Sequence, residues 1–296
     1  MSSPVIFGLW PLAGVTTIGV TSQDADATMT AAIDGGITAF DTAFSYGYDG
    51  ESDRLLGRYL RGDRDRFAVT GKVGQRWSAD RKRVVDGQPT TLVADAETSL
   101  KRIGIEKFDL LMLHSPDPSV AIETSAEAMG DLMNRGLAVR VGVCNVDEDQ
   151  LRRFSGAVAC SSVQCPLNLL QRQSLDHFIP AAAKAGYDVH VYWALMKGLL
   201  AGRIARDHVF AEGDSRPNYE VFQGDARSHA HDVLDKMQGI RESTGKTIAQ
   251  LSIGWAASQP GVAATLVGAR RPEQAAEIAA ATRLTADELA MLDAIV

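Results

Sequence analysis

Four side chains capable of acid–base chemistry lie at or just beyond the ends of short apolar runs. Asp41 and Lys72 fall within the runs 37–43 and 67–73, His114 ends the run 108–114, and Tyr46 follows soon after Asp41. Burying an uncompensated charge is costly, so ionisable groups in such places usually pair or take part in function. In a barrel of parallel strands these positions converge on one mouth, where that fold keeps its active site. The pattern therefore predicts one catalytic set.

The elements that would position this set alternate between strand-like and helix-like patterns. The strand-like runs are 5–10, 37–43, 67–73, 108–114, 139–145, 161–166, 188–194 and 262–268. The helical patterns are 25–35, 51–61, 90–103, 121–135, 147–154, 174–185, 228–258, 272–281 and 285–296, the last opening with a capping-box-like Thr285 and Glu288.

Strand–helix alternation implies right-handed crossovers and a parallel sheet. Eight such units in 296 residues predict an α/β fold, a closed (β/α)₈ TIM barrel forming a single domain over residues 1–296. An open doubly wound sheet is the alternative, but no G-x-G-x-x-G follows the first strand. Two long polar stretches, 74–90 and about 196–227, are expected to act as functional lids or walls.

Composition limits the possible partners and location. The net charge is −7 with no long basic run, which argues against nucleic acid or an anionic membrane. No apolar stretch approaches the length of a transmembrane helix, and the apolar segment 5–20 is interpreted as a first strand and turn in preference to a signal peptide. Three cysteines, Cys144, Cys160 and Cys165, suit buried thiols in a reducing cytoplasm.

The sequence allows two interpretations for several residues. Trp10 and Trp77 follow the first and third strands and are predicted to line a substrate pocket, although Trp10 could equally be core. His229 and His231 could suggest a metal pair, but an i, i+2 spacing points them to different sides of a helix. No metal site is predicted.

The motifs taken together resemble the aldo-keto reductase family, in its bacterial, sugar- or stress-related branch. The stretch FDTAFSYGYDGESDRLLGRYL (40–60) is similar to the family signature. Further motifs follow in family order: TGKVG (70–74), LLMLHSPDP (110–118), VRVGVCN (139–145), VQCPLN (163–168), VYWALMKGLLAGR (191–203) and LVGARRPEQ (266–274). The resemblance covers essentially the whole chain.

The chemistry of the four residues agrees with this resemblance. Carbonyl reduction needs a hydride donor, a proton donor and stabilisation of the developing alkoxide. Tyr46 can give the proton, Lys72 can supply the cation that makes a phenol a better acid, and Asp41 can balance Lys72. A neutral His114 can hydrogen-bond the carbonyl oxygen. The resemblance implies these same roles.

The resemblance also implies an NADP(H) cofactor lying across the barrel mouth. The positions that match its nicotinamide and pyrophosphate contacts are Asn145, Gln164, Tyr192, Leu195, Lys197 and Gly198. Those that match its adenosine end are Gly268, Ala269, Arg270, Gln274 and Glu277. The chain departs from the family pattern at Cys144, Trp193, Gln274 and Ile278.

These departures change what is expected locally. Cys144 replaces a serine and is a weaker donor, and Trp193 is expected to share the stacking or to wall the substrate pocket. Arg270 and Arg271 could compensate for Gln274 at the 2′-phosphate, with Arg271 equally readable as a surface charge.

The prediction is an NADP(H)-dependent oxidoreductase that interconverts an aldehyde or ketone with its alcohol, its substrate being a small carbonyl or sugar-like molecule. One alternative is a nucleotide-binding sensor or auxiliary subunit like the potassium-channel β-subunits. Another is an aldose or alcohol dehydrogenase that works oxidatively. The sequence leaves the oligomeric state open.

Overall fold

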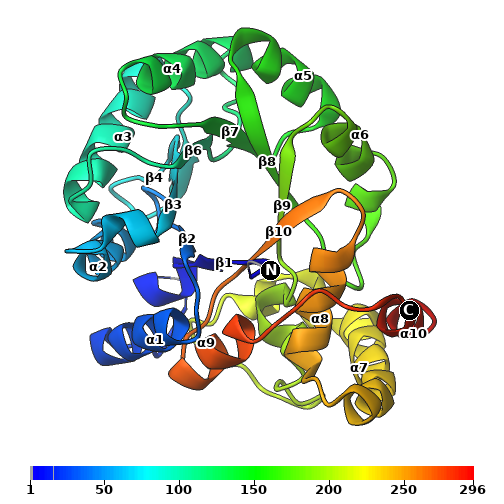
Figure 1. Ribbon diagram of the computed structural model, residues 1–296. Coiled ribbons are helices and arrows are strands. Elements are labelled where there is room, and N and C mark those ends of the chain that lie inside the picture. The colour runs from blue at the N-terminus through cyan, green and yellow to red at the C-terminus, as the bar shows by residue number, and fades with distance from the viewer. Residues whose placement is uncertain (1–2, 16) are drawn as a thin grey trace.

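Eight parallel strands close into one barrel, as predicted from the strand–helix alternation. The computed structural model describes residues 3–15 and 17–296, so Thr16 of the segment 5–20 lies outside them. Around the barrel the strand order is β1-β10-β9-β8-β7-β6-β3-β2 (Figure 1). The strand bounds are Val5–Gly8 (β1), Ala39–Asp41 (β2), Ala68–Val73 (β3), Leu110–Leu113 (β6), Val141–Cys144 (β7), Cys160–Pro166 (β8), Asp188–Tyr192 (β9) and Val262–Val267 (β10).

Helices surround the barrel on its outside (Figure 1). Their bounds are Ser22–Asp34 (α1), Glu51–Leu60 (α2), Pro89–Ile103 (α3), Ile122–Asn134 (α4), Glu148–Ala157 (α5), Phe178–Lys184 (α6), Gly224–Thr244 (α7), Ile248–Ser258 (α8), Pro272–Ala279 (α9) and Ala286–Asp293 (α10). Helix α9 packs against both α1 and α8 and so completes the ring, whereas α7 and α10 are additions that pack on each other.

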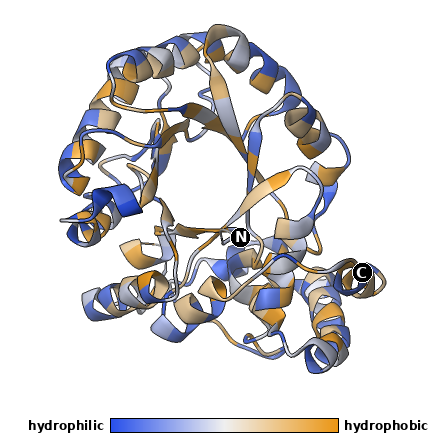
Figure 2. Cartoon of the chain, viewed as in Figure 1, coloured by the Kyte–Doolittle hydropathy of each residue, from blue (hydrophilic) through white to orange (hydrophobic). Residues whose placement is uncertain are grey.

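The core lies between the strands and the ring of helices. Strand β6 is buried along its whole length, since its residues face either the barrel interior or a helix. Hydrophobic residues concentrate in the strands and on the helix surfaces turned toward them, with hydrophilic residues mainly outside (Figure 2). Gly142 is required where β7 meets β8, because a Cβ there would come within 2.4 Å of the Ser162 carbonyl oxygen.

The predicted single helix over 228–258 is wrong. Two helices, α7 and α8, occupy this region because Gly245 adopts a left-handed φ of 71° and ends the first. Thr247 then begins the second with a capping box to Gln250. A similar capping box between Thr285 and Glu288 begins α10, as the sequence predicts.

The two long polar stretches are more ordered than their composition indicates. An antiparallel hairpin of strands Gln75–Trp77 (β4) and Arg83–Val85 (β5) occupies most of the stretch 74–90. The stretch 196–227 contains the short 3-10 helices Met196–Ala201 (η4), Arg216–Asn218 (η5) and Glu220–Phe222 (η6), and Trp10–Ala13 (η1) follows β1.

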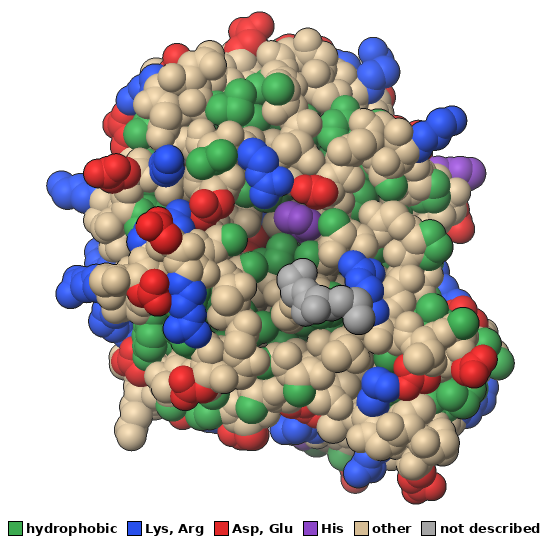
Figure 3. Space-filling view, in the orientation of Figure 1, with side chains coloured by type: hydrophobic (Ala, Val, Ile, Leu, Met, Phe, Trp, Pro, Cys, Tyr) green, Lys and Arg blue, Asp and Glu red, His purple; other side chains and the backbone are tan. Residues whose placement is uncertain are grey.

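The surface carries charges of both signs. On the face that Figure 3 shows, acidic and basic side chains are interspersed over the described residues, without an extended basic patch. None of the described helices has the length and apolar character needed to cross a membrane.

Candidate active site

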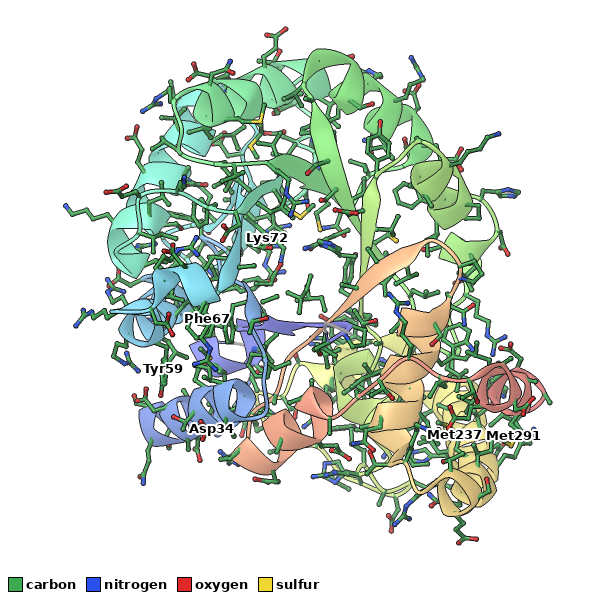
Figure 4. All side chains as sticks on the ribbon, viewed as in Figure 1. Asp34, Tyr59, Phe67, Lys72, Met237 and Met291 are labelled. Carbon is green, nitrogen blue, oxygen red and sulfur yellow. The ribbon has the colours of Figure 1, made fainter. Side chains whose placement is uncertain are left out.

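The carboxyl ends of the strands bring the predicted catalytic residues together. Asp41 ends β2, Lys72 lies one residue before the end of β3, and His114 directly follows β6. Tyr46 lies in the loop between β2 and α2. Lys72, labelled in Figure 4, lies on the inner side of the barrel wall and is 2% exposed. Because all these strands are parallel, their carboxyl ends share one mouth.

A buried hydrogen-bond network joins Asp41, Lys72 and Tyr46. The Lys72 ammonium donates to Asp41 Oδ1 and, at 2.7 Å, to the Tyr46 hydroxyl oxygen. The Tyr46 hydroxyl lies 3.4 Å from Asp41 Oδ1. The Tyr46 and His114 rings meet edge to face with centroids 5.8 Å apart. The phenol therefore stands between a buried ion pair on one side and the imidazole on the other.

Burial and charge set the protonation states of these groups. Burial raises the pKa of the Tyr46 phenol above its ordinary value, although Lys72 lowers it. Burial is the largest single influence on Lys72 and lowers its pKa, but the interactions with Asp41, Tyr46 and Cys144 together outweigh it, so the net pKa is raised. Burial, and then the charges of Lys72 and Arg83, place the pKa of His114 well below its ordinary value. At neutral pH the site thus holds a phenol, an ammonium and a neutral imidazole.

Amide side chains extend the network across the barrel. Gln164 Nε2 donates to Asp41 Oδ2 at 3.1 Å, and its Oε1 accepts a weak bond from the Cys144 thiol at 3.4 Å. Burial raises the pKa of Cys144 to about 12, so it remains a thiol. Asn145 has a left-handed φ of 61°; its Nδ2 donates to the His114 carbonyl oxygen at 2.8 Å. Tyr192 donates its hydroxyl proton to Asn145 Oδ1 at 2.5 Å.

One cavity of about 710 Å³ collects the predicted site residues. Asp41 is the exception, because it is fully buried behind Lys72 and does not reach the cavity. The others line it: Tyr46, Lys72, His114, Asn145, Gln164, Tyr192, Leu195, Lys197, Gly198, Gly268, Ala269, Arg270, Gln274, Glu277, Trp10, Trp77 and Trp193.

The segment after β9 turns its backbone toward the cavity. Met196, Lys197 and Gly198 have positive φ values of 43°, 52° and 95°. Such a run is strained for residues other than glycine and is held here by the surrounding packing. The Lys197 ammonium lies 4.5 Å from the centroid of the Tyr219 ring, and Trp193 packs edge to face on the same ring at 5.4 Å.

The far end of the cavity is rich in arginine. Arg216 and Arg270 both line the cavity, and burial followed by the like charge of Arg216 lowers the pKa of Arg270. Arg216 is held by Asp214 at 2.5 Å, and Arg203 by Glu277 at 2.8 Å.

Gln274, which departs from the family pattern, and Arg271, which could compensate for it, each have a defined structural place here. Gln274 Oε1 accepts from the Arg270 backbone N–H at 3.0 Å and so fixes the loop before α9. Arg271 lies 2.6 Å from Asp24 and donates to the Gly19 carbonyl oxygen at 2.9 Å. Arg271 is therefore a surface partner of α1, and Arg270 is the residue of this pair that lines the cavity.

Several cavity residues are absent from the sequence prediction. Arg83 comes from the β4–β5 hairpin, and Asp214, Arg216 and Tyr219 come from the stretch after β9. Neither 74–90 nor 196–227 carries a strand or helix periodicity that could have selected these residues.

Metal chemistry has no support from clustered ligands. Among residues 3–15 and 17–296, no group of three or more His, Cys, Asp or Glu side chains could hold a metal ion. His229 is exposed and His231 is buried, so the two lie on different sides of α7.

The donor set fits a nicotinamide dinucleotide. Amides and aromatic rings line the cavity next to the catalytic residues, where a carboxamide and a planar ring could be held. Lys197, Arg203, Arg216 and Arg270 line it further along, where phosphates need positive charge. One cavity of this volume lined by both sets of residues suits a dinucleotide.

Comparisons with known proteins agree with this assignment. The model of the aldo/keto reductase family matches residues 4–296. The glycerol dehydrogenase AKR11B4 from Gluconobacter oxydans is 31% identical, with a TM-score of 0.90 over 99% of this chain and 91% of that one. The NADH-specific methylglyoxal reductase of Escherichia coli (strain K12) is 29% identical over 84% of this chain and 79% of the relative.

A further solved structure carries a nucleotide. The aldo/keto reductase from Klebsiella pneumoniae in complex with NADP and acetate is 25% identical, with a TM-score of 0.74 over 99% of this chain and 91% of that one. The fold, the cavity and the full-length family match lead to one conclusion: this chain belongs to the aldo/keto reductase family of oxidoreductases, which act on carbonyl and CH–OH groups.

Proposed function

We propose that this protein is an NADP(H)-dependent reductase that interconverts an aldehyde or ketone with its alcohol, with Tyr46 as the proton donor. The main support is the position of Tyr46. Its hydroxyl oxygen accepts a hydrogen bond at 2.7 Å from the buried Lys72 ammonium, and Tyr46 lines the cavity together with His114. A phenol in that position can transfer a proton to an oxygen in the cavity.

Each of the four residues has a distinct part in the proposed reduction. A nicotinamide held beside these residues would supply the hydride for the carbonyl carbon. Tyr46 gives its proton to the carbonyl oxygen, and Lys72 stabilises the phenolate that remains. Asp41 keeps Lys72 in place. Neutral His114 donates a hydrogen bond to the carbonyl oxygen, which polarises it without competing for the proton.

The cofactor would be held along the whole cavity. Asn145, Gln164 and Tyr192 would hold the nicotinamide, with Trp193 beside them, and the backbone of Leu195, Lys197 and Gly198 would approach the pyrophosphate. Gly268, Ala269, Arg270, Gln274 and Glu277 would hold the adenosine end. Gln164 Nε2 is already bound to Asp41. Its Oε1 accepts a weak bond from the Cys144 thiol, so Oε1 is the amide atom that would meet the nicotinamide.

Preference for NADPH over NADH should depend on Arg270. Arg270→Ala is expected to weaken NADPH binding by about 10–150-fold, since a charge-assisted hydrogen bond contributes about 1.5–3 kcal/mol. NADH, which lacks the 2′-phosphate, should bind nearly as before. Fluorescence-quenching titrations of both nucleotides measure this. Arg271→Ala is the matched control, because that guanidinium is held by Asp24, and it should change neither affinity much.

Two results would overturn this cofactor assignment. Equal losses for both nucleotides in the Arg270 variant would show that this residue does not read the 2′-phosphate. Wild-type preference for NADH, the specificity in the name of the E. coli relative, would contradict NADPH as the cofactor.

Reduction of an uncharged aldehyde should be insensitive to pH over a wide range. The pKa of Tyr46 lies above its ordinary 10.0 and that of His114 well below its ordinary 6.5. Neither group changes its protonation between these limits, so kcat/KM should stay flat between pH 6.5 and 10.0. If kcat/KM rose or fell inside this interval, and the pH of that change shifted on substitution of Tyr46 or His114, the assigned protonation states would be contradicted.

A carbonyl panel with NADPH and NADH, followed by nicotinamide absorbance, tests the proposal as a whole. Small aldehydes and sugar-like carbonyls should be reduced. Oxidation of polyols is the second candidate activity, because the structural neighbour from G. oxydans is described as a glycerol dehydrogenase. Nucleotide binding without turnover in either direction would favour a sensor or auxiliary subunit. A cytoplasmic location is proposed from the three cysteines, which are all free thiols.

A further inference from the structure

A guanidinium group lies at the substrate end of the cavity and comes from the β4–β5 hairpin. Arg83 and Trp77 are cross-strand neighbours in this hairpin. The Arg83 guanidinium carbon is 5.2 Å from the centroid of the Trp77 ring and 4.6 Å from that of Trp10. Stacking on two indoles restricts where the guanidinium can point.

Both indoles are themselves anchored to the catalytic loop. Trp77 donates its Nε1–H to the Ser45 carbonyl oxygen at 2.9 Å. Trp10 packs edge to face on the Tyr46 ring, with centroids 5.1 Å apart. The residues adjoining Tyr46, and Tyr46 itself, therefore fix the position of Arg83 relative to the reacting centre.

Arg83 has no charge partner within the described parts of the chain. No ion pair or hydrogen bond joins its guanidinium to another described residue, and the nearby titratable groups are the phenols of Tyr46 and Tyr219. Arg76 on the same hairpin is bonded to Asp95, and Lys82 lies 2.9 Å from Asp80. In a chain of net charge −7, a cation left unpaired in a cavity wall is a candidate for binding an anion.

The charge of Arg83 also influences the pKa of a predicted catalytic residue, His114. After burial and Lys72, it is the third cause that lowers the pKa of His114. Arg83 lines the same cavity as Tyr46 and His114. The phosphate-rich end of the nucleotide is assigned to Arg203, Arg216 and Arg270, so Arg83 is free to meet the substrate.

We infer that Arg83 binds an anionic group on the substrate, so that the preferred substrates are aldehydes or ketones carrying a carboxylate or a phosphate ester. This inference rests on the proposed carbonyl reduction and specifies its substrate class. The planar guanidinium fork matches both anions, and no hydrogen bond to a described residue occupies it while it lies over the Trp10 and Trp77 rings.

Matched substrate pairs test the inference. Steady-state kcat/KM is measured with NADPH for 4-carboxybenzaldehyde against its methyl ester, and for glyceraldehyde 3-phosphate against glyceraldehyde. The wild type should prefer the charged member of at least one pair, and the pair that responds identifies carboxylate or phosphate. Arg83→Gln should lower kcat/KM for that charged member about 10-fold, the low end for a charge-assisted bond at a solvent-exposed rim.

Two further variants separate charge from shape. Arg83→Lys keeps the charge and should retain part of the preference. Arg81→Gln is the control on the same hairpin: Arg81 lies 4.7 Å from the Tyr48 ring centroid and is not part of the cavity wall, so neither substrate should respond. In Arg83→Gln the neutral members should lose much less kcat/KM than the charged members, so the readout is the ratio of charged to neutral kcat/KM.

Equal loss for charged and neutral substrates in Arg83→Gln would mean that Arg83 only shapes the hairpin, and would overturn the inference. If the wild type reduced the charged and neutral members of both pairs equally well, this inference would be overturned while the proposed reduction would stand. Failure to reduce any of the four carbonyl compounds would overturn this inference and the proposed reduction together.

Discussion

Tyr46→Phe should lower kcat for carbonyl reduction by about 10²-fold or more, the scale of a general acid's contribution. The substitution removes the hydroxyl that accepts from Lys72 at 2.7 Å and leaves the ring that packs between Trp10 and His114. Single-turnover measurements with NADPH and an aldehyde check this directly. Nucleotide affinity should persist, because the residues assigned to the cofactor are unchanged.

Tyr48→Phe is the matched control for this experiment. Tyr48 lies in the same loop, is 42% exposed and is not part of the cavity wall. Its variant should reduce aldehydes at nearly the wild-type rate. Turnover close to wild type in Tyr46→Phe would rule out Tyr46 as the proton donor, whatever its place in the network.

Lys72→Met or Asp41→Asn alone should destabilise the protein by about 3–5 kcal/mol, because each leaves one buried charge without its partner. Both side chains are almost completely buried, at 2% and 0% exposure, so water cannot compensate for the missing ion. Thermal and urea unfolding of the cofactor-free protein measure the loss. The double variant should lose less than the sum of the two single variants, since it leaves no unpaired charge.

An exposed ion pair provides the control for this stability experiment. Arg152 lies 2.5 Å from Asp149 on the surface of α5, with both side chains more than 60% exposed. Arg152→Met should cost about 1 kcal/mol or less, as exposed pairs usually do. Strictly additive losses in the Asp41 and Lys72 cycle would show that the two residues stabilise the barrel independently.

Together the two experiments separate chemistry from stability in the same network. Tyr46→Phe keeps the ion pair and should lose activity with little loss of stability. The single substitutions in the ion pair should lose both. This difference follows from burial: the pair is needed to hold charge away from water, whereas the phenol is needed only when a proton moves.

Local patterns were sufficient to predict the barrel and the positions that face its mouth. Alternation of apolar runs with helical periodicity predicts the eight strands, and Thr285 with Glu288 predicts the start of α10. The sequence also contains a signal for the break after Thr244, since Gly245 is followed by Thr247 and Gln250 in capping-box spacing, although the helical pattern runs through it. Errors of this kind arise when two local signals compete.

Partners distant in sequence could not be predicted from local patterns. Arg271 could equally be a nucleotide ligand or a surface charge until the fold placed it beside Asp24 and Gly19. The bond between Gln164 and Asp41 joins residues on opposite halves of the sequence. Such contacts depend on how the closed barrel aligns its strands, and no spacing along the chain encodes that alignment.

By itself the sequence determined the fold class, the motif-carrying residues and the side chains available at the strand ends, because these follow from local periodicity and residue type. Only the tertiary structure decided which charges remain unpaired. Arg76 forms an ion pair with Asp95, and Arg203 forms one with Glu277. Arg83 instead packs against Trp10 and Trp77 in the cavity wall. Pairing of charges requires proximity in space, and the folding of the hairpin and loops over the barrel mouth sets that proximity.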